Sequence, residues 1–439
     1  MKRHGLLVVI LLTVLLVWSA GCIKRTPAPP PPPAAPPVDR IEKPRPPAPA
    51  VLPPEVRPPE VKPPEVPPPP PAARTERYTV GCIFPLTGRF ADAGTRALEA
   101  VLLSADLFRK GSASPWKIVV TDSGDTPEDM RKAVAYLADE AKVMAIIAVS
   151  GSTEAADAAA EAQKRKVPLL LITSREQVTD AGDYVFQHFL TPAQQMEALA
   201  HYAMNTLDVA IFAVLYPKDD YGEEMLSLFR SELKKVGGKV IRAVGYDKTQ
   251  TDFAREIKEI AGSKFNPQDK VYAASSAVRQ KLPADFEALF IPDSPLRVKM
   301  IASQLAFYDI RNVKLLGTSL WHTPDLLKRG AEYLEGAVFV DSFLENGFYP
   351  ETNDFVDIYY SAYRREPGNI EALAYDTMEI VLGVLEDPRI TSREAFVKNL
   401  LAVQGFRGAT GGTTFRGSRR AQKTAFILKV QNGKIVQVK

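Results

Sequence analysis

The chain has 439 residues, two cysteines and a formal net charge of +3 at pH 7. This near balance of charge gives no support for nucleic-acid binding, and two cysteines cannot build a disulfide framework. A chain of this size can hold a folded core by burial alone.

The amino terminus is typical of an export signal. Lys2 and Arg3 precede an apolar run over residues 6–17, which is shorter than the ~20 residues that span a bilayer. The run SAGC that ends at Cys22 resembles a lipoprotein signal, so residues 1–21 are expected to be removed and Cys22 to carry lipid. An uncleaved anchor is the alternative, and both interpretations export the chain and tether it to a membrane.

Two further residues bear on the expected location. Ile23 stands where an aspartate retains such lipoproteins in the inner membrane of enteric bacteria, which favours the outer membrane. If Cys22 carries lipid, Cys82 has no partner and is expected to be a buried structural thiol.

Residues 22–77 are expected to form a proline-rich, disordered stalk. Residues 26–77 hold 23 of the 37 prolines and repeat PPEVR, PPEVK and PPEV. Such a segment cannot bury a core, and as polyproline II it reaches up to about 150 Å at ~3.1 Å per residue. It is interpreted either as an inert spacer or as a docking site for partner proteins that bind polyproline helices.

Apolar runs and helical patterns alternate from residue 78 onward. The first set of predicted strands comprises residues 78–84, 117–122, 143–149 and 167–172. Helices are predicted from residue 94, from Thr126 as N-cap with Pro127 to about residue 140, and in the Ala-rich run to about residue 163. Residues 184–190 are expected to carry the chain into a second lobe.

The pattern then restarts. The second set of predicted strands comprises residues 209–216, 239–246, 288–292 and 313–317, with helices to residue 236 and over residues 252–261 and 295–307. Residues 263–285 are expected to be a long loop. After a return segment at 336–343, the sequence predicts helices over 354–365, 371–386 and 392–402, a glycine-rich stretch at 405–412, and a hairpin of residues 423–430 and 434–439.

Two successive runs of this kind predict an α/β fold with two lobes, each a mainly parallel sheet flanked by helices. The motifs PLTG (85–88), VPLLLITS (167–174), FLTPAQQ (189–195), LYPKDDYG (215–222) and DFAREI (252–257) resemble, in this order, the Leu/Ile/Val-binding type of receptor in the type 1 periplasmic-binding-protein superfamily. The stretch from Phe290 to Trp321 is similar to the penicillin-binding protein activator branch of lipoproteins.

The resemblance implies a two-lobe binding domain over residues 78–439 with three crossovers between the lobes. Lobe one would comprise about residues 78–188 and 344–408, and lobe two about residues 189–343 and 409–439.

The sequence contains no set of residues with the types and spacing of a known catalytic site. Four histidines occur without metal-ligand spacing, and the sequence holds no HExxH, GxSxG, GxxxxGK[ST] or GxGxxG. The protein is therefore expected not to be an enzyme and to need no metal or cofactor.

Ligands of parallel α/β sheets bind at the carboxyl ends of the strands. The loops there supply hydroxyls, amides and aromatic rings that can orient and cover a polar ligand. The candidate ligand-binding residues are Thr87, Gly88, Phe90, Asp122, Ser150, Ser152, Thr153, Ser174, Arg175, Asp219, Tyr221, Ser319 and Trp321. Each is alternatively a turn former or a helix cap, and Asp219 in particular is also a plausible helix start.

Two positions depart from the amino-acid receptors that the chain resembles. Ser319 stands on the turn where those receptors place an acid for the ligand ammonium. Arg175 follows the fourth strand and is expected either to meet an anionic group or to pair with Glu176 or Asp180.

Two functions remain open. One is a solute receptor that binds a small polar ligand in the interlobe cleft, as a sensor or as the receptor of an ABC permease of the branched-chain amino-acid or amide type. The other is an activator of a cell-wall synthase that acts through protein contacts. Both place the protein in the periplasm, on a lipid anchor.

Overall fold

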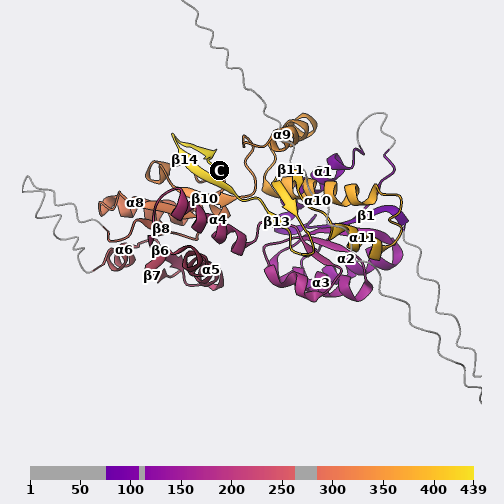
Figure 1. Ribbon diagram of the computed structural model, residues 1–439, viewed down its shortest axis with the longest axis horizontal. Helices are drawn as coiled ribbons and strands as arrows, with labels where there is room; N and C mark the ends of the chain where they lie inside the picture. Colours follow the sequence, from indigo (N-terminus) through magenta and orange to yellow (C-terminus); the bar gives the residue numbers. More distant parts are fainter. Residues whose placement is uncertain (1–75, 108–113, 263–283) are drawn as a thin grey trace, which may run out of the picture. The chain divides into compact units, whose positions relative to one another are not determined.

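The computed structural model describes residues 76–107, 114–262 and 284–439. The expected signal, the stalk up to Thr75 and nearly all of the expected loop at 263–285 lie outside this range. The described chain forms two α/β lobes, each built on its own sheet (Figure 1).

The first lobe is built on a five-stranded parallel sheet in the order β2-β1-β3-β4-β5. Its strands are β1 (Glu76–Phe84), β2 (Lys117–Asp122), β3 (Val143–Val149), β4 (Leu169–Ile172) and β5 (Val185–Gln187). The segment that was expected only to cross between lobes thus first adds a fifth strand to this sheet.

Helices cover both faces of the first sheet because alternate strand residues point to opposite sides. They are α1 (Ala91–Ser104), α2 (Pro127–Ala135) continued by a π-helical turn (Tyr136–Glu140), α3 (Ser152–Arg165), α9 (Pro350–Tyr363), α10 (Asn369–Leu385) and α11 (Arg393–Leu400). Cys82 of β1 packs with α1 and α10, whereas Ile83 packs with α2 and α3 on the other face. As expected, Cys82 is buried, and burial raises the pKa of its thiol.

The second lobe is built on a seven-stranded sheet in the order β15-β14-β10-β9-β8-β6-β7. Its strands are β6 (Ile211–Pro217), β7 (Lys239–Tyr246), β8 (Ala288–Phe290), β9 (Lys314–Gly317), β10 (Val338–Asp341), β14 (Phe426–Gln431) and β15 (Lys434–Gln437). The last two strands are the predicted hairpin, and β14 joins the sheet antiparallel to β10.

Helices also cover both faces of the second sheet. They are α4 (Pro192–Asn205), α5 (Asp220–Val236), α6 (Ala254–Ile260) and α8 (Pro295–Phe307). Phe212 of β6 packs with α4 and α5, and Leu215 packs with α6 and α8.

The chain passes between the lobes three times, as predicted. The first two crossovers follow β5 and β10, and the third is the segment of residues 415–425, which includes the short strand β13 (Gln422–Lys423). The strands β11 (Phe406–Gly408), β12 (Gly411–Thr414) and β13 form a small antiparallel sheet where the sequence indicated only a glycine-rich stretch. Ala409, Phe415 and Ala421 pack into the core of the first lobe, so residues 409–421 lie with that lobe and not with the second, to which they were assigned.

One close contact between helix and strand end occurs in both lobes. A Cβ on Gly94 of α1 would lie 1.9 Å from the carbonyl oxygen of Pro85, just after β1. A Cβ on Gly222 of α5 would lie 2.0 Å from the carbonyl oxygen of Pro217, at the end of β6. In each lobe only glycine lets the helix that follows the first strand approach the end of that strand this closely.

Candidate functional site

The strand-end loops of the first lobe are joined through Asp122. Its carboxylate accepts hydrogen bonds from the hydroxyl of Thr87 at 2.6 Å and from the backbone amides of Leu86 at 3.0 Å and Gly124 at 3.2 Å. Burial opposes ionisation, but these hydrogen bonds outweigh it and lower the pKa of Asp122. Asp122 therefore fixes the loop after β1 to the loop after β2.

The other candidates of this lobe lie at the same sheet edge. Gly88 and Phe90 form a short 3₁₀ turn, and the Phe90 side chain is 55% exposed. The hydroxyl of Ser150 donates to the carbonyl of Gly151 at 3.0 Å, which makes it a turn former. Ser152 is the first residue of α3, and the exposed Thr153 follows it.

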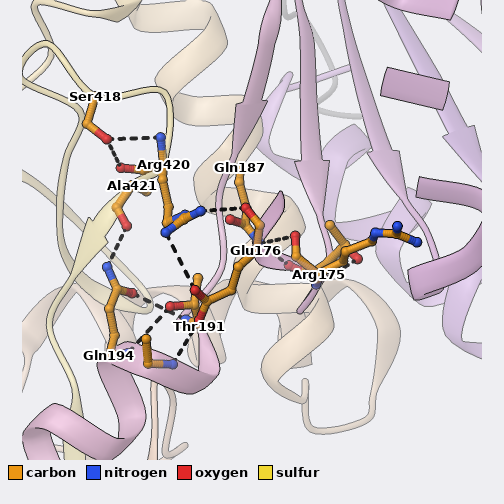
Figure 2. A network of polar contacts seen from close by, with 10 residues as sticks. Arg175, Glu176, Gln187, Thr191, Gln194, Ser418, Arg420 and Ala421 are labelled. Atoms are coloured by element: carbon orange, nitrogen blue, oxygen red, sulfur yellow. Dashed lines mark hydrogen bonds and ion pairs between the residues drawn. The ribbon is translucent and has the colours of Figure 1, made fainter. Parts of the chain in front are cut away.

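The loop after β4 carries Ser174, which is exposed, and Arg175. Glu176, the next residue, pairs with Arg420 of the third crossover at 3.5 Å rather than with its neighbour. Figure 2 shows the guanidinium of Arg175 directed away from the Glu176 carboxylate. The predicted pairing of Arg175 with Glu176 is therefore wrong.

Two candidates in the second lobe serve the fold locally. Asp219 caps α5 by accepting a hydrogen bond from the backbone amide of Gly222 at 3.0 Å, so its alternative reading as a helix start holds. The hydroxyl of Tyr221 lies 2.9 Å from that of Thr318, and burial raises the pKa of Tyr221 to about 12. Tyr221 therefore stays neutral and links the start of α5 to the turn after β9.

The turn after β9 contains Ser319 and Trp321, which differ in exposure. The amide of Ser319 donates to the side-chain oxygen of Gln195 at 3.1 Å. Trp321 is fully buried, and its indole donates to the carbonyl of Ile291 at 3.1 Å. Trp321 thus belongs to the core, and its ring does not cover a ligand at the strand ends.

The carboxylates of Asp293, in the loop after β8, and of Asp341, the last residue of β10, accept hydrogen bonds from protein donors. Asp293 accepts hydrogen bonds from the hydroxyl of Tyr246 at 2.7 Å and from the amide of Ser294 at 2.6 Å. Asp341 lies 2.6 Å from the imidazole of His322 and also accepts from the side chain of Asn369. Neither carboxylate is left without a donor of its own.

A model of the family described as periplasmic binding protein matches residues 77–434. The chain belongs to the periplasmic binding protein family. This periplasmic binding protein is 25% identical over 288 residues to a Pseudomonas aeruginosa protein named amino acid binding protein, a match that covers 62% of the chain and 73% of that relative.

Solved structures agree with the fold. A Rhodospirillum rubrum protein assigned to a branched-chain amino acid ABC transporter matches with a TM-score of 0.71 at 22% identity, over 82% of this chain and 99% of the other. The branched-chain amino acid binding protein of Streptococcus pneumoniae, solved with isoleucine, matches with a TM-score of 0.62 at 22% identity, over 82% and 99%. The expected superfamily and fold class are therefore confirmed.

The described residues of this periplasmic binding protein hold no cluster of histidine, cysteine or acidic side chains fit for a metal ion. Among the same residues, no helix is long and apolar enough to cross a membrane.

A buried charged cluster in the first lobe was not predicted. Lys423 of β13 donates to the imidazole of His188 at 3.0 Å, to the hydroxyl of Thr410 at 2.8 Å and to that of Thr413 at 2.9 Å. Asp376 of α10 accepts from the amide of Thr410 at 2.8 Å and from its hydroxyl. We name these five residues the crossover cluster, because they connect the first and third crossovers to α10.

Hydrogen bonding fixes the state of His188 in the crossover cluster. The atom Nε2 accepts from Lys423, so the proton lies on Nδ1, which is 2.7 Å from the hydroxyl of Thr377. Burial and the charge of Lys423 lower the pKa of His188 well below its usual value. Burial also lowers the pKa of Lys423 to about 8, although Asp376 opposes this shift.

His322 should make stability depend on pH. Burial disfavours its charged form, but the hydrogen bond and charge of Asp341 outweigh burial and raise the pKa of His322. This stabilisation is complete below the unfolded-state pKa of about 6.5 and is lost as pH rises through the folded-state pKa. In urea titrations, His322→Gln should therefore lower the free energy of unfolding more at pH 5 than at pH 8.5.

The matched control is His201→Gln, because His201 is exposed on α4. If His322→Gln lowers the free energy of unfolding equally at both pH values, the neutral imidazole already provides the full stabilisation and the prediction is wrong.

Proposed function

We propose that this periplasmic binding protein is an exported, non-enzymatic lipoprotein that binds a small polar ligand in a cleft between its lobes. The family match over residues 77–434 carries the proposal. The strand-end loops support it, since Ser174 and Phe90 are exposed in loops at the same edge of the first sheet. We infer that it serves as the receptor of an ABC permease of the branched-chain amino-acid or amide type, or as a sensor.

The test is a thermal-shift screen of the full chain in detergent against amino acids, peptides, small carboxylic acids and cell-wall fragments. Ligand bound only by the native state raises the melting temperature by mass action. A hit that is lost when the loop residue Ser174 is changed to a bulky side chain would support the receptor function. Failure of every compound class at millimolar concentration would count against it.

The second candidate function is activation of a cell-wall synthase, which the protein would reach by means of its stalk. The observation that favours it is the turn at Ser319, which has no carboxylate where amino-acid receptors of this type place one. The strand-end acids Asp219, Asp293 and Asp341 are engaged by protein donors and do not replace it. Pull-down of a synthase by the full chain, together with a negative ligand screen, would favour this function.

We also propose that lipid on Cys22 anchors the protein to a membrane, with the outer membrane preferred. Cys22→Ser should move the protein from the membrane fraction to the soluble periplasmic fraction. Cys82→Ser is the control and should stay in the membrane fraction, because Cys82 is buried in β1. Incorporation of labelled palmitate into the Cys22→Ser variant would refute the assignment.

A further inference from the structure

One buried side chain holds the loop of residues 173–176 in place through hydrogen bonds to the loop backbone. It follows β4 and carries Ser174 and Arg175, two of the candidate ligand contacts. Gln187, the last residue of β5, is fully buried. Its side-chain nitrogen donates to the carbonyl of Thr173 at 2.8 Å and to that of Arg175 at 2.9 Å (Figure 2). Both amide hydrogens of Gln187 are thus used on the backbone of this loop.

The third crossover pairs with the backbone of the same glutamine. The amide of Gln187 donates to the carbonyl of Arg419 at 2.8 Å, and the amide of Ala421 donates to the carbonyl of Gln187 at 2.9 Å. Residues 419–421 therefore extend the sheet edge beyond β5, as the parallel bridge between Gln187 and Arg420 indicates. The glutamine that holds the loop is itself held by a crossover.

Glu176 ties the loop to the second lobe. One carboxylate oxygen accepts a hydrogen bond from the amide of Ala193, in the first turn of α4, at 2.9 Å. The other lies 3.5 Å from the guanidinium of Arg420, which also donates to the carbonyl of Glu176 at 2.6 Å. The side chain of Gln194 donates to the carbonyl of Ala421 at 2.8 Å and completes the network (Figure 2).

The loop is therefore bonded to a strand of its own lobe, to a crossover and to a helix of the other lobe. Two-lobe binding proteins close by rotation about their crossovers. Such a rotation displaces Ala193 relative to β4, whereas Arg420 stays with the first lobe through its pairing beside β5, so the bond between Glu176 and Ala193 must shift with the rotation. A loop held only within its own lobe would not respond in this way.

We propose that Glu176, Gln187 and Arg420 are positioning residues that make the shape of loop 173–176 depend on the hinge. This inference rests on the proposed function, because the loop matters only if it faces a ligand. The loop presents Ser174 and Arg175 in one geometry for each hinge state. Ligand affinity is then set partly by residues of the crossover that do not touch the ligand.

Hydrogen–deuterium exchange of the full chain tests the proposal without any ligand. In Arg420→Ala, the amides of segments 173–178 and 190–195 should exchange at least about 5-fold faster than in the wild type, because local opening becomes easier. Arg420→Lys keeps a charged donor and should restore most of the protection. Gln187→Met should accelerate exchange in segment 173–178 without doing so at the start of α4.

Arg131→Ala is the matched control. Arg131 lies in the same lobe, pairs with Glu128 and Asp157, and has a side chain that is 39% exposed against 36% for Arg420. It should leave both segments unchanged.

Exchange in segment 173–178 of Arg420→Ala within twofold of the wild type would overturn the proposal. Uniform acceleration through β1 to β4 would overturn it as well, since it would reveal only general destabilisation. Neither result bears on the ligand screen, and a negative screen leaves the exchange result standing, so the two proposals can fail separately.

Discussion

Lys423→Met should lower the free energy of unfolding by about 3–5 kcal/mol, because it leaves the carboxylate of Asp376 buried without a counter-charge. Asp376 is fully buried in the first lobe, and the partly buried Lys423 reaches it through the hydroxyl of Thr410. Urea denaturation of the full chain at pH 7 measures the loss.

Two further variants separate the charge from the packing. The double change Lys423→Met with Asp376→Asn removes both charges and should cost less than the sum of the single changes. Glu128→Gln breaks an exposed ion pair with Arg131 and should cost less than about 1 kcal/mol. A loss below about 1 kcal/mol for Lys423→Met itself would show that Asp376 is already protonated in the native state, since burial raises its pKa.

Leucine should bind the full chain about 30- to 5000-fold more weakly than a receptor with a carboxylate on the turn after β9, a loss of ~2–5 kcal/mol. Ser319 occupies that turn and can accept a hydrogen bond from an ammonium group without neutralising its charge. The engaged carboxylates of Asp219, Asp293 and Asp341 offer no replacement. Calorimetry should give a dissociation constant near one millimolar or weaker.

Substitution at the same turn provides the matched test. Ser319→Glu should strengthen leucine binding, whereas the neutral isostere Ser319→Gln should not. A dissociation constant near one micromolar for the unmodified chain would show that another carboxylate receives the ammonium. Glu224, exposed in α5 just after its first turn, would be the first to test by Glu224→Gln.

The strands and helices were largely predictable because their periods are local. β2, β3, β7 and α8 have the predicted bounds, and Thr126 caps α2 as expected, since apolar runs, proline and capping residues act over a few neighbours. The strands β11 and β12 were missed because their glycines carry no side-chain pattern.

The sequence predicted where the candidate site residues lie in the chain, but not the direction in which their side chains point. Sequence placed Trp321 after β9 correctly, yet its ring turns into the core because the carbonyl of Ile291 accepts its indole hydrogen. The crossover cluster could not be found at all. His188, Asp376 and Lys423 are far apart in the chain, and only the crossovers bring them together.

The paired contacts of Gly94 with Pro85 and of Gly222 with Pro217 give each lobe one rigid segment at its strand ends. Each contact locks a helix start to the strand end of its own lobe by backbone packing, with no bond to a crossover. The strand-end segments after β1 and β6 therefore move as rigid parts of their own lobes. The loop after β4 differs from them, because its geometry changes when the lobes rotate about the hinge.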